Sequence, residues 1–461
     1  MNRKAEKRLG EWLGGRKRKP LVIRGARQVG KTTLVRDFAK GRGLVLNEVN
    51  LERHREFRGV FASMDPVAIC DRLSAHLGRD VRAEGGLLFL DEIQAVPEAL
   101  AALRYFHEEM PGLPVVSAGS LLEFTLAKHE FPMPVGRIEY LHVGPMDFME
   151  FLEAANPYLA SRLTMREVCA EGGFALHGES MKWVRTYLLT GGMPECVARW
   201  LESRSLAEAL AAQEDILGTY VDDFAKYAGG RDLAALQGVF RKLPGQVGKK
   251  VKYVNFSREM KSREVKSALE LFAKARLITP VWHTDANGVP LGAEEDRDVW
   301  KPLFLDVGLM NHANGVGAAD VEALRDAELV NEGAMAEQFV GQQLLWRGGG
   351  RAEPALHYWL REGGMNNAEV DYVVARGREV VPVEVKSGKS GALRALRRMM
   401  EEKGLPRAIR FDAGEFSAQR IQGSGGREWE LTTLPLYAAA FALDERNDGE
   451  AETEVEDDRK R

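Results

Sequence analysis

A chain of 461 residues is too long for one ordinary hydrophobic core, so its length predicts two to four domains. Hydrophobic residues make up 45% and charged residues 29%, with a net charge of −4, which is ordinary for a globular protein. The three cysteines form no CxxC pair. The basic N-terminus is not followed by an apolar run, as it would be in a signal peptide, and no apolar run is long enough to span a membrane. These features argue against a disulfide framework, a zinc site and a secreted or membrane protein, so we expect a cytoplasmic location.

Charge is unevenly distributed along the chain. Residues 444–461 hold nine acidic and four basic residues, which predicts a disordered acidic tail. Residues 241–266 hold nine lysines and arginines against two glutamates. Such a run is typical of a solvated helical face, and it also fits a nucleic-acid surface.

The order of apolar runs predicts an α/β protein of several domains. In the N-terminal part, five apolar runs alternate with helical patterns and predict a parallel sheet covered on both faces. These runs are Leu21–Ile23, Leu44–Leu46, Leu87–Leu90, Val115–Ala118 and Tyr140–Val143. A mostly helical stretch follows, ends in a hairpin candidate with an Asn-Gly turn at Val281–Leu291, and precedes a second α/β region. The expected domains are residues 20–143, 144–230, 231–309 and 332–443, followed by the tail at 444–461.

A glycine-rich loop follows the first predicted strand. The segment GARQVGKT (Gly25–Thr32) matches G-x-x-x-x-G-K-[ST] in full, and an amphipathic helical pattern comes after it. In this strand–loop–helix context, backbone N–H groups close around phosphates. Lys31 would reach the β- and γ-phosphates of ATP, and the Thr32 hydroxyl would bind Mg²⁺. The predicted nucleotide-binding residues are Gly25, Ala26, Arg27, Gln28, Val29, Gly30, Lys31, Thr32 and Thr33.

A second motif, LLFLDE (Leu87–Glu92), predicts a buried strand that ends in two carboxylates. Ligands of open α/β sheets bind at this end of the strands. Asp91 would hold Mg²⁺ through water as the acidic partner of Thr32, and Glu92 would orient or deprotonate the attacking water. The sequence lacks the N-K-x-D and T-K-x-D motifs that read guanine, so we expect ATP rather than GTP.

Two further polar residues are candidates for the same site. Ser120 follows the strand Val115–Ala118 and would sense the γ-phosphate, while Arg137 would stabilise developing charge as an arginine finger. A helix cap and a surface arginine are equally good interpretations of the two residues. The sequence does not decide whether Arg137 acts in its own chain or on a second copy, so a homo-oligomer stays open as a partner.

Several segments occur together in an order that resembles a known family: GARQVGKTTL, LLFLDEIQ, SAGS, the Gly136–Arg137 pair with GPMDFMEF after it, and GGMPE. The chain is similar, from about Pro20 to Tyr437, to prokaryotic AAA-type ATPases whose C-terminal half is a domain of unknown function with a restriction-endonuclease-like core. The resemblance implies an ATPase core, a helical lid, a winged-helix region and a nuclease-like domain, in the order of the four expected domains.

The last α/β region has its own carboxylate pattern. Asp371 lies in EVDYVV, and Glu384 and Lys386 share one face of the following strand because residues i and i+2 of a strand point the same way. Asp371 and Glu384 would bind a second Mg²⁺, and Lys386 would position the water or stabilise the transition state. Glu337, on the preceding predicted helix, is the fourth candidate. The arrangement is similar to that of the restriction-endonuclease-like superfamily, although the same scaffold also serves as a binding module.

The basic stretch in the middle predicts a short helix, a turn, a longer helix and a wing strand. Val265, Leu269, Phe272 and Ala275 form the predicted inner stripe of the longer helix. Lys261, Arg263 and Lys266 would lie on its outer face and contact DNA or RNA. A winged helix that only packs domains together explains the pattern equally well.

Two functions therefore stay open. In the first, the chain is an ATP-hydrolysing enzyme coupled to nucleic-acid binding or cleavage through its C-terminal domain. In the second, it is a nucleotide-switched regulatory or scaffold protein whose nuclease-like domain is inactive and only binds DNA or protein. The intact Glu337, Asp371, Glu384 and Lys386 set favours the first, and the nearly neutral body of the chain favours the second.

Overall fold

The chain folds into two compact units in its computed structural model. The first unit comprises Met1–Gly144, Lys274–Leu277 and Gly348–Pro354. The second comprises Pro145–Ala273, Ile278–Arg347 and Ala355–Arg461. The described residues are 1–120, 122, 134, 136–228, 231–316, 333–363, 367–386, 393–423 and 426–443. The predicted acidic tail at 444–461 lies outside them.

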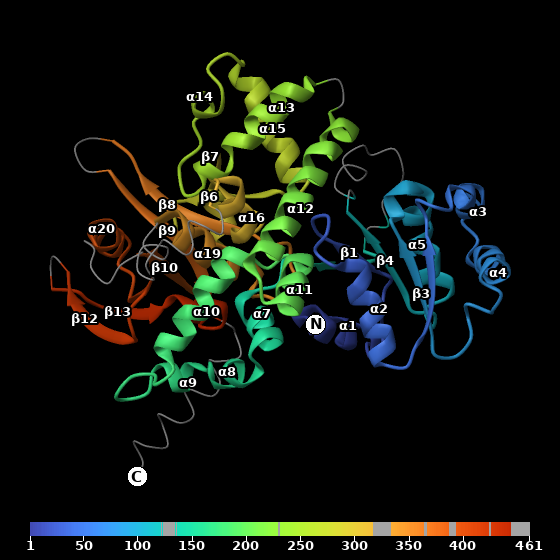
Figure 1. Cartoon of the computed structure of the whole chain (residues 1–461), viewed down its shortest axis with the longest axis horizontal. Helices are drawn as coiled ribbons and strands as arrows, with labels where there is room; N and C mark the ends of the chain where they lie inside the picture. The colour runs from blue at the N-terminus through green and yellow to red at the C-terminus, as the bar shows by residue number, and fades with distance from the viewer. Residues whose placement is uncertain are drawn as a thin grey trace, which may run out of the picture. The chain divides into compact units, whose positions relative to one another are not determined.

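The first unit is built on a five-stranded parallel sheet of order β2-β3-β4-β1-β5 (Figure 1). Its strands are β1 (Leu21–Arg24), β2 (Val45–Asn50), β3 (Gly86–Asp91), β4 (Val115–Gly119) and β5 (Glu139–His142). All five strands predicted from apolar runs are present, and the predicted α/β class is confirmed. Because the strands are parallel, their carboxyl ends meet at one edge, where open α/β sheets bind ligands.

Helices cover this sheet. They are α1 (Lys4–Leu13), α2 (Lys31–Gly41), α3 (Arg58–Phe61), α4 (Pro66–Leu77) and α5 (Pro97–Glu109), with 3₁₀ turns at Arg55–Phe57 and Ile93–Ala95. The side chain of Asp65 caps α4 by accepting the N–H groups of Val67 and Ala68, and Gly78 ends it in a left-handed conformation. Every residue of β3 is buried, as expected for a continuous apolar strand covered on both faces.

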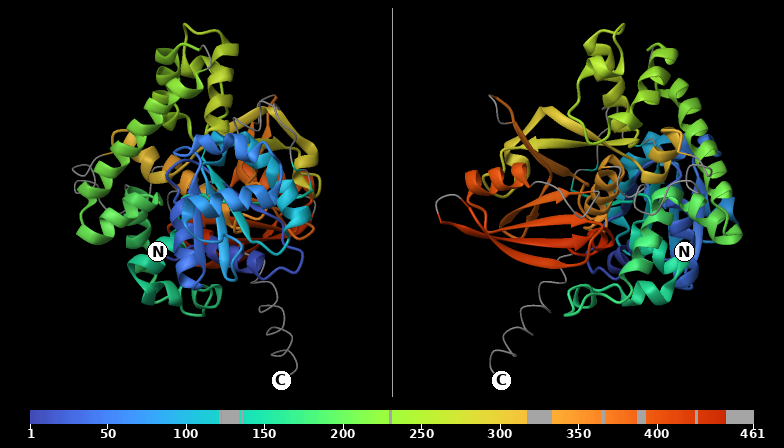
Figure 2. Two further views of the ribbon diagram at one scale, coloured as in Figure 1. Left: turned by 90° about the vertical axis from the view of Figure 1, so that its right-hand side faces the viewer. Right: turned by 60° about the vertical axis from the view of Figure 1, so that its left-hand side comes forward.

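The second unit contains an eight-stranded sheet of order β12-β13-β11-β10-β9-β8-β6-β7, whose strands are spread out in the right-hand view of Figure 2. Its strands are β6 (Ile278–Thr284), β7 (Glu295–Phe304), β8 (Leu356–Arg361), β9 (Ala368–Arg376), β10 (Glu379–Val385), β11 (Arg407–Asp412), β12 (Ser417–Gln422) and β13 (Glu428–Pro435). β8, β9 and β10 pair as an antiparallel meander, and β10 continues into parallel pairing with β11.

The helices of the second unit confirm the predicted helical middle of the chain. They are α7 (Phe148–Ala155), α8 (Pro157–Arg162), α9 (Met165–Val168), α10 (His177–Thr190), α11 (Pro194–Ser203), α12 (Leu206–Tyr227), α13 (Leu233–Lys242), α14 (Tyr253–Phe256), α15 (Ser262–Lys274), α16 (Val307–Ala313), α19 (Gly333–Trp346) and α20 (Arg394–Lys403), with 3₁₀ turns at Pro244–Gln246, Leu291–Glu294 and Leu436–Ala440. α19 contacts β7, β8 and β10, whereas α20 contacts β9 and β11. Within the described part of the chain, no helix is long and apolar enough to cross a membrane.

The structure corrects the expected wing. β6 and β7 pair antiparallel, as predicted, but β6 also pairs parallel with β8, so the hairpin belongs to the eight-stranded sheet rather than to a separate winged helix. The Asn-Gly pair does not form a tight two-residue turn, because the connection from β6 to β7 spans Asp285–Glu294. Asn287 instead folds this longer loop by bonding through its backbone N–H and its side-chain amide to the Glu294 carboxylate.

Candidate functional site

The glycine-rich loop joins the end of β1 to the start of α2, and its shape depends on glycine at two positions. Gly25 has φ 156°, and a Cβ there would come within 2.1 Å of the Val143 carbonyl oxygen. Gly30 has φ 85° and precedes the first residue of α2. Both conformations are costly for residues with a side chain. The loop therefore presents its backbone at the N-terminus of α2, where anions bind.

Lys31 is folded back onto this loop. Its Nζ donates hydrogen bonds to the carbonyl oxygens of Gly25 (3.1 Å) and Ala26 (2.6 Å). Burial lowers the pKa of Lys31 to about 8, although the carboxylates of Glu92 and Asp91 act in the opposite direction. The ammonium group is thus bonded only to neutral carbonyls, and a phosphate would be a stronger partner for it.

Thr32 and Asp91 are in direct contact. Thr32 Oγ1 lies 3.1 Å and 3.3 Å from the two carboxylate oxygens of Asp91, the last residue of β3. The pKa of Asp91 is raised by burial and then by the negative charge of Glu92, while the hydrogen bond from Thr32 opposes the rise. A hydroxyl and a partly desolvated carboxylate are the oxygen ligands that Mg²⁺ prefers. This donor set therefore fits the predicted Mg²⁺ site.

Glu92 is held by two neighbours. It has φ 51°, a left-handed conformation uncommon for glutamate, immediately after β3. Its Oε2 accepts hydrogen bonds from Gln94 Nε2 at 2.5 Å and from Ser120 Oγ at 3.5 Å. The structure thus brings Ser120 beside Glu92, because β4 lies between β1 and β3 in the sheet. Gln94 is the last residue of LLFLDEIQ, and its contact with Glu92 was not predicted from the sequence.

Arg137 does not lie at this site in its own chain. It precedes β5, so it is at the amino edge of a parallel sheet whose carboxyl edge carries the loop. There its Nε donates to Glu108 Oε1 at 2.9 Å, near the end of α5. The position of Arg137 therefore does not support action on the nucleotide site of its own chain, and action on a second copy stays a prediction.

The second candidate site gathers around β9 and β10, as predicted. The two strands are antiparallel neighbours, and Asp371 Oδ2 accepts the backbone N–H of Val385 at 2.7 Å. Lys386 Nζ forms an ion pair with Glu384 Oε1, which confirms that these two side chains share a face. Burial, and then the charge of Asp371, together raise the pKa of Glu384 to about 7 against the opposing effect of Lys386.

Glu337 from α19 also reaches this region, where it has a partner that was not predicted from the sequence. Lys301 of β7 places its Nζ 2.5 Å from Glu337 Oε1 and 3.3 Å from Glu369 Oε1. The Lys301 side chain is only 1% exposed, and its Nζ lies 5.1 Å and 5.2 Å from the ring centroids of Tyr358 and Tyr372. Burial alone would lower the pKa of Lys301, but its carboxylate neighbours raise it above its ordinary value.

A metal fits only part of this cluster. Among the described residues, no group of three or more histidine, cysteine or acidic side chains is arranged to hold a metal ion. Glu337 is engaged by Lys301, so it is not free to act as a ligand. In contrast, Glu384 Oε2 is buried without a hydrogen-bond partner, and Asp371 interacts with the same carboxylate. The donor set that fits a divalent cation is therefore Asp371 with Glu384.

The residues predicted to contact nucleic acid are exposed at the start of α15. Arg263 and Lys266 lie on its outer face, and Lys261 directly precedes its first residue, Ser262. Val265, Leu269, Phe272 and Ala275 are all buried, which confirms the predicted inner stripe. The outer face also carries acidic groups, because Lys266 pairs with Asp298 at 3.5 Å and Glu264 caps the start of the helix through the Lys261 N–H.

Comparison with known proteins agrees with the geometry of the first unit. Residues 17–152 match the family model described as an AAA domain. This stretch includes the glycine-rich loop and the strand that ends in Asp91. Residues 181–320 and 332–431 match two models described as domains of unknown function, DUF8612 and DUF4143. No curated protein matches the chain.

Three solved structures show remote similarity to the chain. The structure of the Aeropyrum pernix ORC2 protein in ADPNP-ADP complexes is 14% identical, with a TM-score of 0.35, over 69% of this chain and 92% of that one. The structure of C. elegans PCH-2 is 11% identical, with a TM-score of 0.27, over 46% and 64%. The structure of the Aeropyrum pernix ORC1 protein in complex with DNA is 15% identical, with a TM-score of 0.25, over 70% and 93%.

Proposed function

We propose that the chain binds and hydrolyses ATP at the loop between β1 and α2, with Mg²⁺ held by Thr32 and Asp91. The observation that carries the proposal is the contact between these two side chains, which belong to motifs 59 positions apart. A chance match to a short loop motif would not bring a hydroxyl and a strand-end carboxylate together at the N-terminus of a helix. The bound Mg²⁺ would neutralise charge on the phosphates.

The residues of the chain have separate tasks in this proposal. Backbone N–H groups of the loop and the N-terminus of α2 hold the phosphates. Lys31 exchanges its two carbonyl partners for phosphate oxygens, which are stronger acceptors because they are charged. Glu92 accepts a proton from the attacking water, or orients it, once its carboxylate is released from Gln94. Ser120 lies beside Glu92 and would contact the γ-phosphate.

The direct test is phosphate release from ATP and from GTP in the presence of Mg²⁺. We expect hydrolysis of ATP, no comparable hydrolysis of GTP, and loss of both binding and turnover in Lys31→Ala. Asp37→Ala is the matched control, because Asp37 is exposed on the same helix, α2, and has no assigned nucleotide or metal role. If Thr32→Ala and Asp37→Ala hydrolyse ATP equally well, the proposed metal site is wrong.

A second candidate function is metal-dependent cleavage of a nucleic-acid backbone at Asp371, Glu384 and Lys386. The unpartnered oxygen of the buried Glu384 carboxylate favours it. A divalent cation held by Asp371 and Glu384 would act there as a Lewis acid, and Lys386 would stabilise charge on the phosphate. Incubation of the protein with Mg²⁺ or Mn²⁺ and mixed DNA and RNA, with and without ATP, tests this function. Metal binding without cleavage would support the alternative, a nucleotide-switched regulatory or scaffold protein whose domain only binds DNA or protein.

A further inference from the structure

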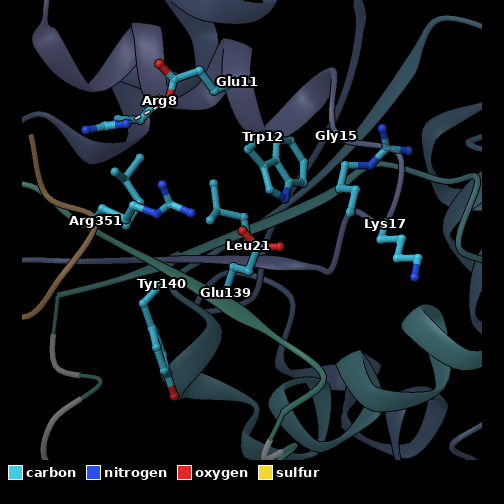
Figure 3. Close-up of a pocket in the computed structure, with 11 residues that line it drawn as sticks. Arg8, Glu11, Trp12, Gly15, Lys17, Leu21, Glu139, Tyr140 and Arg351 are labelled. Atoms are coloured by element: carbon cyan, nitrogen blue, oxygen red, sulfur yellow. Dashed lines mark hydrogen bonds and ion pairs between the residues drawn. The ribbon is translucent and has the colours of Figure 1, made fainter.

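A hollow of about 220 Å³ lies in the first unit, away from the candidate nucleotide site (Figure 3). Its wall includes Leu21 and Glu139, which are the first residues of β1 and β5 and are paired in the sheet. The hollow therefore opens at the amino edge of the parallel sheet, whereas the glycine-rich loop is at the carboxyl edge. Trp12 of α1 supplies an aromatic ring to the wall, whereas the Tyr140 ring points away from the other lining side chains (Figure 3).

The charged side chains around the hollow are unbalanced. Four cations, Arg8, Lys17, Arg18 and Arg351, face two carboxylates, Glu11 and Glu139. Only Arg8 is neutralised by a lining carboxylate, through the 2.7 Å ion pair with Glu11. Within the described parts of the chain, the other three cations form no ion pair.

Arg18 and Arg351 are both held in place by the backbone. Arg18 donates to the carbonyl oxygens of Leu13 (2.9 Å) and Gly112 (2.8 Å), and its guanidinium lies 5.6 Å from the Trp12 ring centroid. Burial lowers the pKa of Arg18, as expected for a charge that has lost water without gaining a counter-ion. An anion in the hollow would supply that counter-ion.

Arg351 comes from a segment distant in sequence that is fixed beside β5. The His142 N–H donates to the Gly350 carbonyl oxygen at 2.8 Å. Gly350 has φ 78°, and a Cβ there would come within 1.9 Å of the His142 carbonyl oxygen. Such a close approach requires glycine at this position. The backbone that carries Arg351 is therefore fixed beside β5, and Figure 3 shows the Arg351 side chain among the residues that line the hollow.

We propose that this hollow binds a phosphate group of a single-stranded nucleic acid. Guanidinium groups match phosphate oxygens in a planar, bidentate geometry. The volume exceeds that of a lone phosphate, and the exposed Glu139 carboxylate supplies a hydrogen-bond acceptor for a base. The basic run Arg16–Lys19 extends the positive charge beyond the hollow. Neighbouring phosphates of a bound nucleic-acid strand would contact this extension.

The test uses the full-length protein and a fluorescent single-stranded DNA oligonucleotide, with affinity measured by anisotropy over a range of salt concentrations. The variant is Lys17→Ala with Arg351→Ala. The matched control is Lys40→Ala with Arg72→Ala, which removes two exposed cations from α2 and α4 of the same unit. We expect the hollow variant to bind at least tenfold more weakly and its salt slope to fall by about 1–2, while the control changes little.

Competition distinguishes the classes of ligand. Unlabelled single-stranded DNA should displace the probe at far lower concentration than polyglutamate of equal charge or inorganic phosphate. Equal losses of affinity in the two variants would overturn the site, and equal competition by polyglutamate would overturn the assignment to nucleic acid in favour of an acidic protein. ATP hydrolysis should be retained in both variants, so failure of this inference is distinct from failure of the proposed ATPase function.

Discussion

Lys301 Nζ lies 2.5 Å from Glu337 Oε1, a contact between a strand and a helix in the interior of the second unit. The Lys301 side chain is 1% exposed and that of Glu337 is 13% exposed. Because the pair is buried, removing Lys301 leaves the charge of Glu337 uncompensated, whereas removing both leaves only Glu369, whose side chain is 34% exposed. This relationship separates Glu337 from the carboxylates that fit a metal.

The ion pair predicts a specific pattern of stability. Lys301→Met should lower the free energy of unfolding of the second unit by about 3–5 kcal/mol, because Glu337 stays buried without its partner. Adding Glu337→Gln should recover much of the loss. Calorimetry of the three proteins measures this, and a double variant that is less stable than Lys301→Met would contradict the pairing.

Glu92→Gln should retain ATP binding and slow hydrolysis by ~10²-fold or more, as loss of a general base does. The glutamine keeps the size of the side chain but removes the carboxylate that accepts the water proton. ATP affinity by calorimetry and single-turnover phosphate release separate the two effects. Hydrolysis at the unmutated rate would show that Glu92 has no such role.

ATP affinity should fall as the pH rises above about 8. The pKa of Lys31 in the free protein is lowered to about 8, mainly by burial, so the side chain is increasingly neutral above that pH. Phosphate binding favours the ammonium form, so each ATP bound above pH 8 should take up a proton. Calorimetry in buffers of different ionisation enthalpy counts this proton. Uptake of the same size in Lys31→Arg, which stays charged, would assign the proton to another group.

Mg²⁺ or Mn²⁺ should stabilise the second unit through Asp371 and Glu384. The pKa of Glu384 is raised to about 7 in the folded protein. Ionisation of this carboxyl group therefore lowers the free energy of unfolding. The loss is absent below the ordinary pKa of glutamate, grows as the pH rises toward 7 and is complete above it. We therefore expect the metal-free unit to unfold at a lower temperature at pH 8 than at pH 5. Metal should restore stability at pH 8, but not in Asp371→Asn with Glu384→Gln. Equal stabilisation of both proteins would place the metal elsewhere.

Replacing Lys261, Arg263 and Lys266 by alanine tests the predicted nucleic-acid face of α15. If that face binds duplex DNA, affinity and its salt slope should both decrease in the triple variant. Glu264 and the Lys266–Asp298 pair reduce the net positive charge there, so the effect should be smaller than three isolated cations would give. An unchanged salt slope would remove α15 as a DNA site.

The sequence by itself determined the parts of this protein whose information is local. The strand–loop–helix context of GARQVGKT, the strand ending in Asp91 and the shared face of Glu384 and Lys386 each depend on a few consecutive residues with a fixed backbone period. Their predicted elements are present, and Thr32 lies against Asp91 as expected.

Only the tertiary structure decided which distant side chains meet. Nothing in the local sequence distinguishes Lys301 from other charged residues of a strand, and only the packing of α19 against β7 brings it to Glu337. The sequence predicted the β6–β7 hairpin as the wing of a winged helix, whereas in the structure β6 pairs with β8 and the hairpin belongs to the larger sheet. These relationships depend on contacts between elements far apart in the chain, and no local periodicity or spacing records such contacts.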